Sequence, residues 1–472
     1  MIKIYTYQIP LERLRQTATV LLMFLLGNLT AKAIDKPVNF VVFLTDDQGW
    51  GDLGSYGHPL IQSPNIDHFA AEGIRFTQCY AASAICSPSR SAILTGRTPY
   101  RNGVFTWLPE RDRVHLRSSE ITIPTLLKQK GYETCHVGKW HLNGWFNSPQ
   151  QPQPSDHGYD WWLATQNNAV PSHKNPTNFA RNGKPLGQLQ GYSALIVVDE
   201  AIAWLKKQRD RSKPFFLTVW THEPHLPIES APRFMAFYRG DQGLREHHGN
   251  ITQIDYAFGK LMKALDDLEL REDTFVIYTS DNGPEGTGIR DPDAEKKYPY
   301  RTKLRGSTGP LRGRKRDVYE GGIRVPGIIR WPQSIKAGSV SDEPITGSDI
   351  FTTVASIAGV TPPKDRTIDG ADMRPAFEGQ RIDRDVPLYW RCRIARGPKI
   401  AMRIGDWKIL ANESLTTFEL YNLRHDPRES YEVSEKYPQE FERMQTGLRK
   451  LNAEIEAEGP SWWRDYKNPR DP

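Results

Sequence analysis

Four short apolar segments, each followed by polar side chains, constrain the fold more than any other feature of the sequence. They lie at residues 38–44, 132–141, 215–220 and 274–279. Apolar, β-branched runs of this length are typical of strands that are buried on both faces of a parallel sheet. Helix-like stretches separate these segments along the chain. Alternating strands and helices predict an α/β fold, in which helices cover both faces of the sheet.

The polar residues at the ends of these segments predict a shared site, because ligands of open α/β sheets gather at the carboxyl ends of the strands. Those residues are Asp46, Asp47, Lys139, His141, His222, Asp281 and Asn282. One such strand end would mean little, whereas four of them favour a common site. The alternative for the paired aspartates is a solvated turn, and single histidines are more often structural than catalytic.

A cysteine at the head of an apolar, helix-like run adds a group that can be modified. Cys86 begins this run, and Pro88 and Arg90 follow at alternate positions. Helix N-termini favour anions, and Arg90 adds a full positive charge. The segment therefore predicts an anion-binding corner that contains a thiol. The alternative is a buried structural cysteine, which is the usual role of a free cysteine.

The sequence changes character after about residue 377. Short strand-like pieces precede a charged, helix-like segment at about 438–458. This pattern predicts a small antiparallel sheet with a packed helix. We expect a domain that carries the strand-end residues at 34–376 and a small C-terminal α+β domain at 377–472.

The first 33 residues are typical of a signal peptide. Basic residues precede an apolar run at 19–26, and residues 31–33 read Ala-Lys-Ala, which fits a cleavage site. The apolar run is too short to cross a bilayer comfortably. We therefore expect an exported chain, periplasmic or secreted, without a stable membrane span. The alternative is an uncleaved N-terminal anchor.

The net charge and the cysteine content argue against two other classes of protein, namely nucleic-acid-binding proteins and disulfide-rich proteins. A formal charge of +6 over 472 residues is too small to indicate a general nucleic-acid-binding protein. Four cysteines in a chain of this length do not form a disulfide framework. If Cys86 is used chemically, at most one disulfide can form among Cys79, Cys135 and Cys392, and the sequence does not choose the pair.

Six blocks of residues, in the same order along the chain, resemble a known family. The blocks are Thr45-Asp46-Asp47, Cys86-Ser87-Pro88-Ser89-Arg90 with Leu94-Thr95-Gly96-Arg97, Gly138-Lys139-Trp140-His141, His222-Glu223-Pro224-His225, Asp281-Asn282-Gly283, and Lys315 ahead of 319–326. They resemble the type I, formylglycine-dependent sulfatases of the alkaline phosphatase superfamily, most closely the arylsulfatase A and N-acetylgalactosamine-6-sulfatase branches. The resemblance implies an alkaline-phosphatase-like mixed sheet flanked by helices, and it is looser over the C-terminal region.

The resemblance implies a sulfuric ester hydrolase in which a separate maturation enzyme oxidises Cys86 to formylglycine. Asp46, Asp47, Asp281 and Asn282 would hold Ca²⁺, a cation that prefers oxygen ligands, and the hydrated formylglycine at position 86 would complete the shell. Arg90 and Lys139 would stabilise the formylglycine and the charge of the sulfate.

The resemblance also implies roles for the remaining residues. Asp281 would help to deprotonate the attacking hydroxyl, and attack on sulfur would give an enzyme-bound sulfate ester and a free alcohol. His222, with Lys315, would protonate or stabilise the leaving oxygen. His141 would then take a proton from the second hydroxyl, so that elimination releases sulfate. His225 would either contact the substrate or only cap its loop.

The expected substrate is a sulfated oligo- or polysaccharide of the glycosaminoglycan or algal type. The basic loop at 301–316 is either a solvated loop or a subsite for a multiply sulfated chain. Two alternatives remain. One is a phosphonate monoester or phosphodiester hydrolase of the same superfamily, although such relatives tend to carry histidine where this chain has Asn282. The other is a non-catalytic sulfoglycan-binding protein, which would apply if Cys86 stays a thiol.

Overall fold

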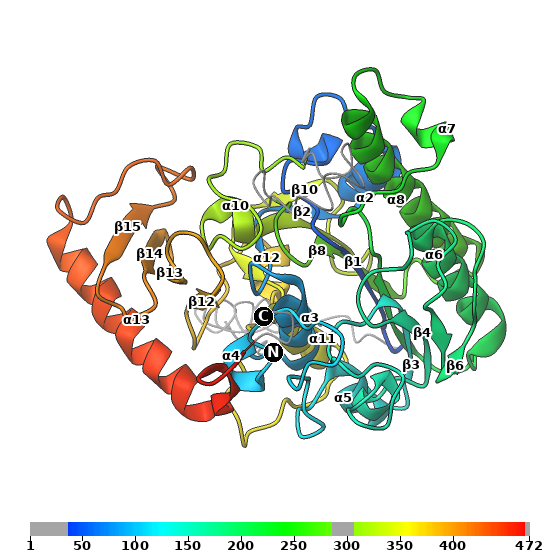
Figure 1. Ribbon diagram of the computed structural model, residues 1–472, viewed down its shortest axis with the longest axis horizontal. Coiled ribbons are helices and arrows are strands. Elements are labelled where there is room, and N and C mark those ends of the chain that lie inside the picture. Colours follow the sequence, from blue (N-terminus) through cyan, green and yellow to red (C-terminus); the bar gives the residue numbers. More distant parts are fainter. Residues whose placement is uncertain (1–35, 286–305, 468–472) are drawn as a thin grey trace, which may run out of the picture. The chain divides into compact units, whose positions relative to one another are not determined.

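A computed structural model describes residues 36–285 and 306–467, and the described residues from Val38 onward form one compact unit (Figure 1). The expected signal peptide at 1–33 and residues 301–305 of the basic loop lie outside the described residues. None of the helices within the described ranges combines the length and the apolar character that crossing a bilayer requires.

Parallel strands form the centre of the large sheet. Their order is β8 (Thr274–Ser280), β1 (Asn39–Thr45), β7 (Phe215–Trp220), β3 (Glu133–Lys139) and β4 (Trp161–Thr165). Every residue of β1, β7 and β8 is buried. This burial confirms the interpretation of their apolar runs as strands covered on both faces.

Further strands extend the sheet on both sides and make it mixed. Antiparallel to β8 lies β9 (Arg324–Arg330), followed by β2 (Ile74–Tyr80), with β10 (Ser339–Ser341) and β11 (Ile345–Thr346) both paired to β2. At the other edge, β5 (Ala180–Arg181) and β6 (Lys184–Pro185) continue from β4 in antiparallel pairing. The predicted mixed sheet is thus confirmed.

Helices cover both faces, because alternate side chains of each strand point to opposite sides. Val41 and Phe43 of β1 pack with α2 (Pro64–Glu72), α6 (Ser193–Ala203) and α8 (Gln242–Asp267). Phe40 and Val42 face the other core. That core contains residues of α3 (Cys86–Thr95), α5 (Ile123–Lys128) and α11 (Asp349–Ile357).

Shorter helical elements connect these parts. They are α4 (Pro99–Asn102), α7 (Pro232–Met235), α10 (Glu320–Ile323), α12 (Arg374–Phe377), the 3₁₀ turns η1 (Gly54–Tyr56), η2 (Pro154–His157) and η4 (Ser461–Trp463), and the π-helical η3 (Trp204–Gln208). The long helix α8 begins at Gln242, where Asp241 caps it by accepting a hydrogen bond from the Leu244 N–H.

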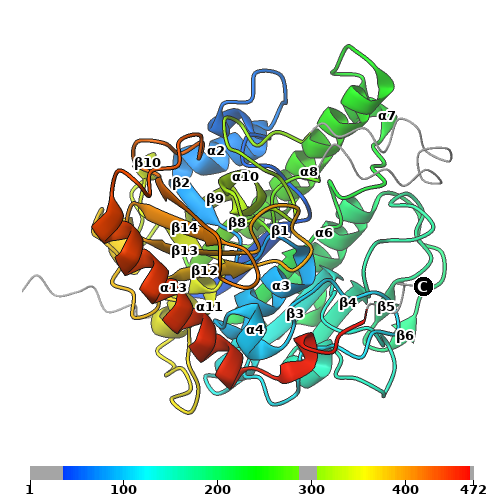
Figure 2. The same cartoon turned by 60° about the vertical axis from the view of Figure 1, so that its left-hand side comes forward.

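The C-terminal region forms a second, antiparallel sheet, as predicted. Its order is β12 (Leu388–Arg391), β13 (Ile400–Ile404), β14 (Trp407–Ala411) and β15 (Phe418–Asn422). Helix α13 (Pro438–Glu458) runs across these strands, and Met444, Leu448 and Ile455 of this helix are buried (Figure 2). In Figure 1 this sheet and α13 lie on the left, whereas α6 and α8 lie on the right.

Buried charges join the two sheets. Lys408 of β14 lies 2.9 Å from a carboxylate oxygen of Glu320, which begins α10, and 2.8 Å from a carboxylate oxygen of Glu429. The side chains of all three residues are fully buried. The backbone N–H of Glu320 also donates to Glu429, at 2.7 Å. One lysine of the small sheet therefore holds the chain segment that leads into β9.

We predict that Lys408→Met destabilises the protein by about 3–5 kcal/mol, because it leaves two buried carboxylates without a positive partner. Urea unfolding measures this change. Lys450→Met is the matched control, since Lys450 and Glu454 form an exposed pair on α13. Equal unfolding midpoints for the two variants would contradict the prediction.

Candidate functional site

Four neighbouring parallel strands deliver the predicted site residues to one edge of the large sheet. The register places Leu44 of β1 beside Trp220 of β7 and Thr279 of β8, and it places Gly138 of β3 beside Trp220. The strands therefore end level with one another. The residues that follow each strand meet at this edge, as the sequence predicts.

The acidic residues form one buried cluster at this edge. Asp46, Asp47, Asp281 and Asn282 are each at most 3% exposed. Asp281 accepts a hydrogen bond from the Asp47 N–H at 3.2 Å, and the Asn282 side-chain amide donates to Asp47 at 2.7 Å. Asp47 has φ of +68°, a left-handed conformation that is uncommon for residues other than glycine.

Two fully buried cations face these carboxylates. Arg90 donates through Nε at 3.0 Å and Nη2 at 2.7 Å to one oxygen of Asp281. Lys139 Nζ lies 2.6 Å from Asp46. Burial opposes ionisation of Asp46, yet Lys139 and the other nearby cations hold its pKa well below its usual range. Burial and the neighbouring Asp46 raise the pKa of Asp281 instead.

A third cation comes from the loop that follows the undescribed segment. Lys315 Nζ lies 2.7 Å from Asp47 and 3.6 Å from Glu285. The basic neighbours of Lys315 bind elsewhere: Arg314 donates to the Gly306 carbonyl, and Arg316 pairs with Glu285. The structure thus places Lys315, and not an adjacent arginine, at the cluster.

Cys86 is the first residue of α3 and is 4% exposed. Arg90 lies one turn later on the same helix, which explains how both can face the strand ends. Burial raises the pKa of the Cys86 thiol, although the positive charges of Lys139 and Lys315 oppose this rise. An unmodified thiol at this position is therefore a weak nucleophile. All four cysteines are free and buried, so the structure contains no disulfide among them.

The structure separates the two histidines that follow β7. His222 is fully buried, and its Nε2 lies 2.8 Å from the Thr165 hydroxyl at the end of β4. The chain then turns, with the His225 N–H donating to the His222 carbonyl. This turn carries His225 to the cluster, where its Nε2 lies 3.7 Å from Asp47. The His225 side chain is 18% exposed, whereas that of His222 is enclosed.

The family resemblance assigned the leaving oxygen to His222 and left the role of His225 open. The two positions differ in the structure because of the turn after β7 and the contact of His222 with Thr165. Thr165, the partner of His222, carries no signal in the sequence that points to the site.

His141 reaches the site through an unusual backbone. Its φ is +56°, and its Nε2 lies 3.1 Å from the Leu108 carbonyl. Its Nδ1 is buried and has no hydrogen-bond partner within the described ranges. This nitrogen is available to a group that enters the site.

The cluster suits a metal cation. Ligand atoms of Asp46, Asp47 and His225 all lie within 4.8 Å of one another. Among the described residues, Asp46 Oδ1 and Asn282 Oδ1 are buried without a hydrogen-bond partner, which is costly for polar oxygens. Hard oxygen donors of this kind are the ligands that Ca²⁺ and Mg²⁺ prefer. The residues present therefore fit such an ion.

Comparisons with known proteins agree with this geometry. The family model "Sulfatase" matches residues 38–360, and "N-sulphoglucosamine sulphohydrolase, C-terminal" matches residues 313–457. The chain is 37% identical to N-acetylgalactosamine-6-sulfatase of Rattus norvegicus over 411 residues, which is 81% of this chain and 73% of the relative. It is 33% identical to arylsulfatase A of Homo sapiens over 482 residues, which covers 91% of each.

A solved structure has a similar fold. The structure described as Ps i-CgsB in complex with k-i-k-neocarrahexaose superposes with a TM-score of 0.77 at 26% identity, and the match covers 92% of this chain and 98% of that one. The family model thus covers more than half of the chain, and both of these relatives share more than 30% sequence identity with it. The chain belongs to the sulfatase family and is a sulfuric ester hydrolase.

Proposed function

We propose that this protein is an exported, calcium-dependent sulfatase that removes sulfate from a sulfated carbohydrate, with formylglycine formed from Cys86 as its nucleophile. One observation carries the proposal: Cys86 begins α3 beside a buried cluster in which three carboxylates face three cations. Export rests on the N-terminal sequence alone. A maturation enzyme that oxidises Cys86 follows from the same proposal.

The charges of the cluster suit an anionic ester. Asp46, Asp47 and Asp281 would hold calcium together with the Asn282 side-chain oxygen. When bound, calcium would polarise a sulfate oxygen as a Lewis acid. Arg90, Lys139 and Lys315 balance the three carboxylates, so the added cation leaves an excess of positive charge. Preorganised positive charge stabilises an anionic reacting group most strongly where water is excluded.

Protons would move at two histidines and one aspartate. Asp281 would accept a proton from the attacking hydroxyl at position 86. His141 would accept the proton that leaves position 86 when sulfate is released, because its buried Nδ1 has no partner within the described residues.

For the leaving oxygen we propose His225, together with Lys315, in place of His222. The Nδ1 of His225 lies 2.5 Å from the Leu226 carbonyl and its Nε2 faces Asp47, so to act as an acid the ring would carry protons on both nitrogens. Both His225 and Lys315 lie within 3.7 Å of Asp47. His222 binds Thr165 through Nε2, which would hold the loop in place, while its Nδ1 is buried without a partner within the described residues.

A carbohydrate substrate is supported by the named relatives. These include N-acetylgalactosamine-6-sulfatase and a structure solved with a carrageenan-type hexasaccharide. Parallel assays with an aryl sulfate and an aryl phosphodiester separate this proposal from a phosphodiester hydrolase of the same superfamily.

We predict that Cys86→Ala abolishes release of inorganic sulfate and that Cys135→Ala, a control at another buried cysteine, retains it. Mass spectrometry of the peptide that contains residue 86 should show an aldehyde in active protein. An unmodified thiol in fully active protein, or activity in Cys86→Ala, would contradict the proposal.

We predict that His225→Ala slows hydrolysis of a carbohydrate sulfate by about 10²–10⁴-fold, the usual contribution of a general acid. The loss should shrink on a nitrophenyl sulfate, because its leaving group needs little protonation. His222→Ala is the control, and its loss should not depend on the leaving group. If instead the loss in His222→Ala shrinks on the nitrophenyl sulfate and the loss in His225→Ala does not, the general acid is His222.

We predict that calcium raises the thermal midpoint of chelator-treated protein, because a ligand that binds only the folded state stabilises it by about 2.7 kcal/mol at a hundredfold excess over Kd. Asn282→Leu should lose most of this increment. Asn250→Leu, at another buried asparagine, should keep it. Scanning calorimetry measures both, and an undiminished increment in Asn282→Leu would contradict the assignment.

A further inference from the structure

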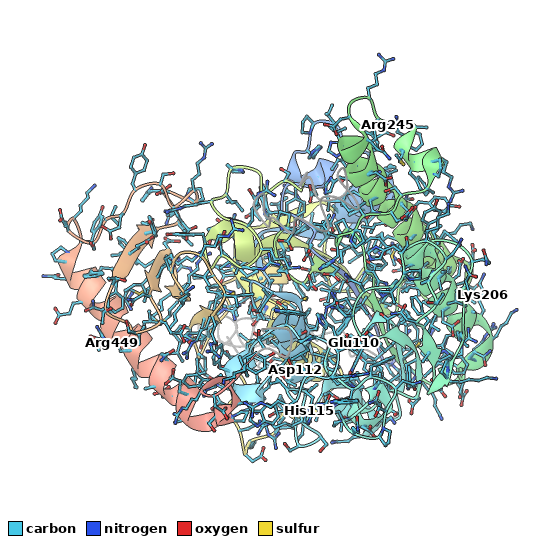
Figure 3. The ribbon with its side chains drawn as sticks, viewed as in Figure 1. Glu110, Asp112, His115, Lys206, Arg245 and Arg449 are labelled. Carbon is cyan, nitrogen blue, oxygen red and sulfur yellow. The ribbon has the colours of Figure 1, made fainter. Side chains whose placement is uncertain are left out.

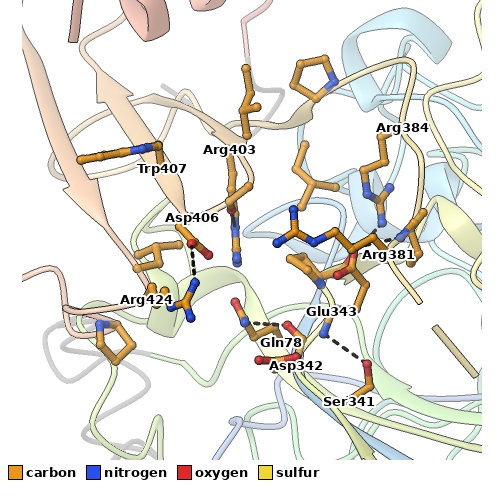
Figure 4. Close-up of a pocket in the computed structure, with 18 of the residues that line it drawn as sticks. Gln78, Ser341, Asp342, Glu343, Arg381, Arg384, Arg403, Asp406, Trp407 and Arg424 are labelled. Atoms are coloured by element: carbon orange, nitrogen blue, oxygen red, sulfur yellow. Dashed lines mark hydrogen bonds and ion pairs between the residues drawn. The ribbon is translucent and has the colours of Figure 1, made fainter. Parts of the chain in front are cut away.

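A cavity of about 1060 Å³ lies between the outer strands of the large sheet and the C-terminal sheet (Figure 4). Its walls come from β10 and the loop after it, from residues 379–387, from the turn between β13 and β14, and from residues 422–427. Its lining residues include none of those gathered at the ends of β1, β3, β7 and β8. The volume matches that of pockets that hold sizeable ligands.

The lining of this cavity is rich in arginine. It contains Arg324, Arg381, Arg384, Arg403 and Arg424, against Asp342, Glu343 and Asp406. Some of these groups are already engaged: Arg384 pairs with Asp349, Arg324 lies 3.3 Å from Glu320, and Asp406 lies 3.8 Å from Arg424. Glu343 accepts a hydrogen bond from the Ile382 N–H. The lining itself still carries more cationic than anionic side chains.

Two of these arginines are free to bind a ligand at the cavity surface. Arg381 is exposed, and its side chain makes no hydrogen bond or ion pair with the part of the chain that the structure describes. The Arg424 side chain is 70% exposed, and its one ion pair within residues 36–285 and 306–467 is the long one with Asp406. An exposed pair of this kind costs little to open.

Arg403 supplies a preorganised group deeper in the cavity. It is 3% exposed, and Figure 4 shows its guanidinium directed into the space between Gln78 and Arg424. Its Nε donates to the Gly405 carbonyl at 2.7 Å, and its Nη1 donates to the Tyr80 hydroxyl. These contacts fix the planar guanidinium, whose remaining N–H groups match the paired oxygens of an oxyanion.

An aromatic side chain completes the lining. Trp407 is half-buried, and its ring packs edge-on against Tyr437 at 5.0 Å between centroids. A large aromatic surface next to cationic groups suits a ligand that has both apolar faces and charge. A sulfated sugar has both, because its ring presents C–H groups and its substituents are anionic.

We propose that this cavity binds an anionic segment of a sulfated polysaccharide and holds the chain at a second place, outside the site of hydrolysis. The identity of the ligand rests on the proposed function, whereas the cavity and its charge do not. Arg381, Arg403 and Arg424 bind sulfate groups of the chain, and Trp407 packs against a sugar ring.

The test uses the double variant Arg381→Ala/Arg424→Ala, because both side chains are exposed and lie outside the catalytic cluster. The control is Lys206→Ala/Arg449→Ala, which removes one positive charge on η3 and one on α13. Figure 3 shows Lys206 on the right of the view and Arg449 on the left. Each pair is placed in full-length Cys86→Ala protein, so that the probes bind without turnover. The probes are a sulfated carrageenan hexasaccharide, a chondroitin 6-sulfate hexasaccharide and their desulfated forms.

Calorimetry should show that the cavity variant binds at least one sulfated probe about tenfold more weakly than the parent, a change of 1.4 kcal/mol. The control should bind like the parent, and the desulfated probes should bind weakly to all. With Cys86 restored, the cavity variant should hydrolyse a nitrophenyl sulfate with unchanged kcat and KM. The proposal is overturned if the parent and the cavity variant bind the sulfated probes with equal affinity. It is also overturned if the control variant loses as much affinity as the cavity variant, or if neither sulfated probe binds.

The binding assay also separates this proposal from the proposed function. If the protein with Cys86 intact releases no sulfate from any carbohydrate, the proposed function fails. Weakened binding by the cavity variant would still support the second site in that case, because binding is measured without turnover.

Discussion

The structure of the site depends on the pairing of three buried carboxylates with three buried cations at the ends of parallel strands. Asp46 pairs with Lys139, Asp47 with Lys315, and Asp281 with Arg90. Each buried charge without a partner would cost several kcal/mol of folding free energy. The carboxylates and the cations of the cluster therefore have to be present together. The same pairing keeps positive charge next to Cys86. A cation that took over the carboxylates would free the basic side chains for an anionic ester.

The C-terminal sheet supports this cluster through a second buried network. Lys408 holds Glu320, which lies five residues after Lys315, and the Lys315 N–H donates to the Pro284 carbonyl beyond Asp281 and Asn282. Arg403 of the same sheet reaches the Tyr80 hydroxyl, which in turn donates to Glu320. The small sheet is thus linked both to the loop that carries Lys315 and to the arginine-rich cavity.

Much of the fold and of the site could be predicted from the sequence, because both follow from local patterns. The apolar runs specify buried parallel strands, and aligned strands bring Asp46, Asp281 and Lys139 together without further information. The choice between His222 and His225 could not be made in this way, since it depends on a turn and on Thr165 of another strand. The arginine-rich cavity also escaped prediction. Its residues come from segments that are far apart in the chain and meet only when the two sheets pack.

The most direct test is a crystal structure of the mature protein with calcium and a bound sulfate ester or inorganic sulfate. We expect an oxidised residue 86 and a cation held by Asp46, Asp47, Asp281 and Asn282. We also expect Lys139 and Lys315 to turn from the carboxylates towards the sulfate oxygens. A thiol at position 86, with both lysines still paired to the aspartates and sulfate bound elsewhere, would contradict it.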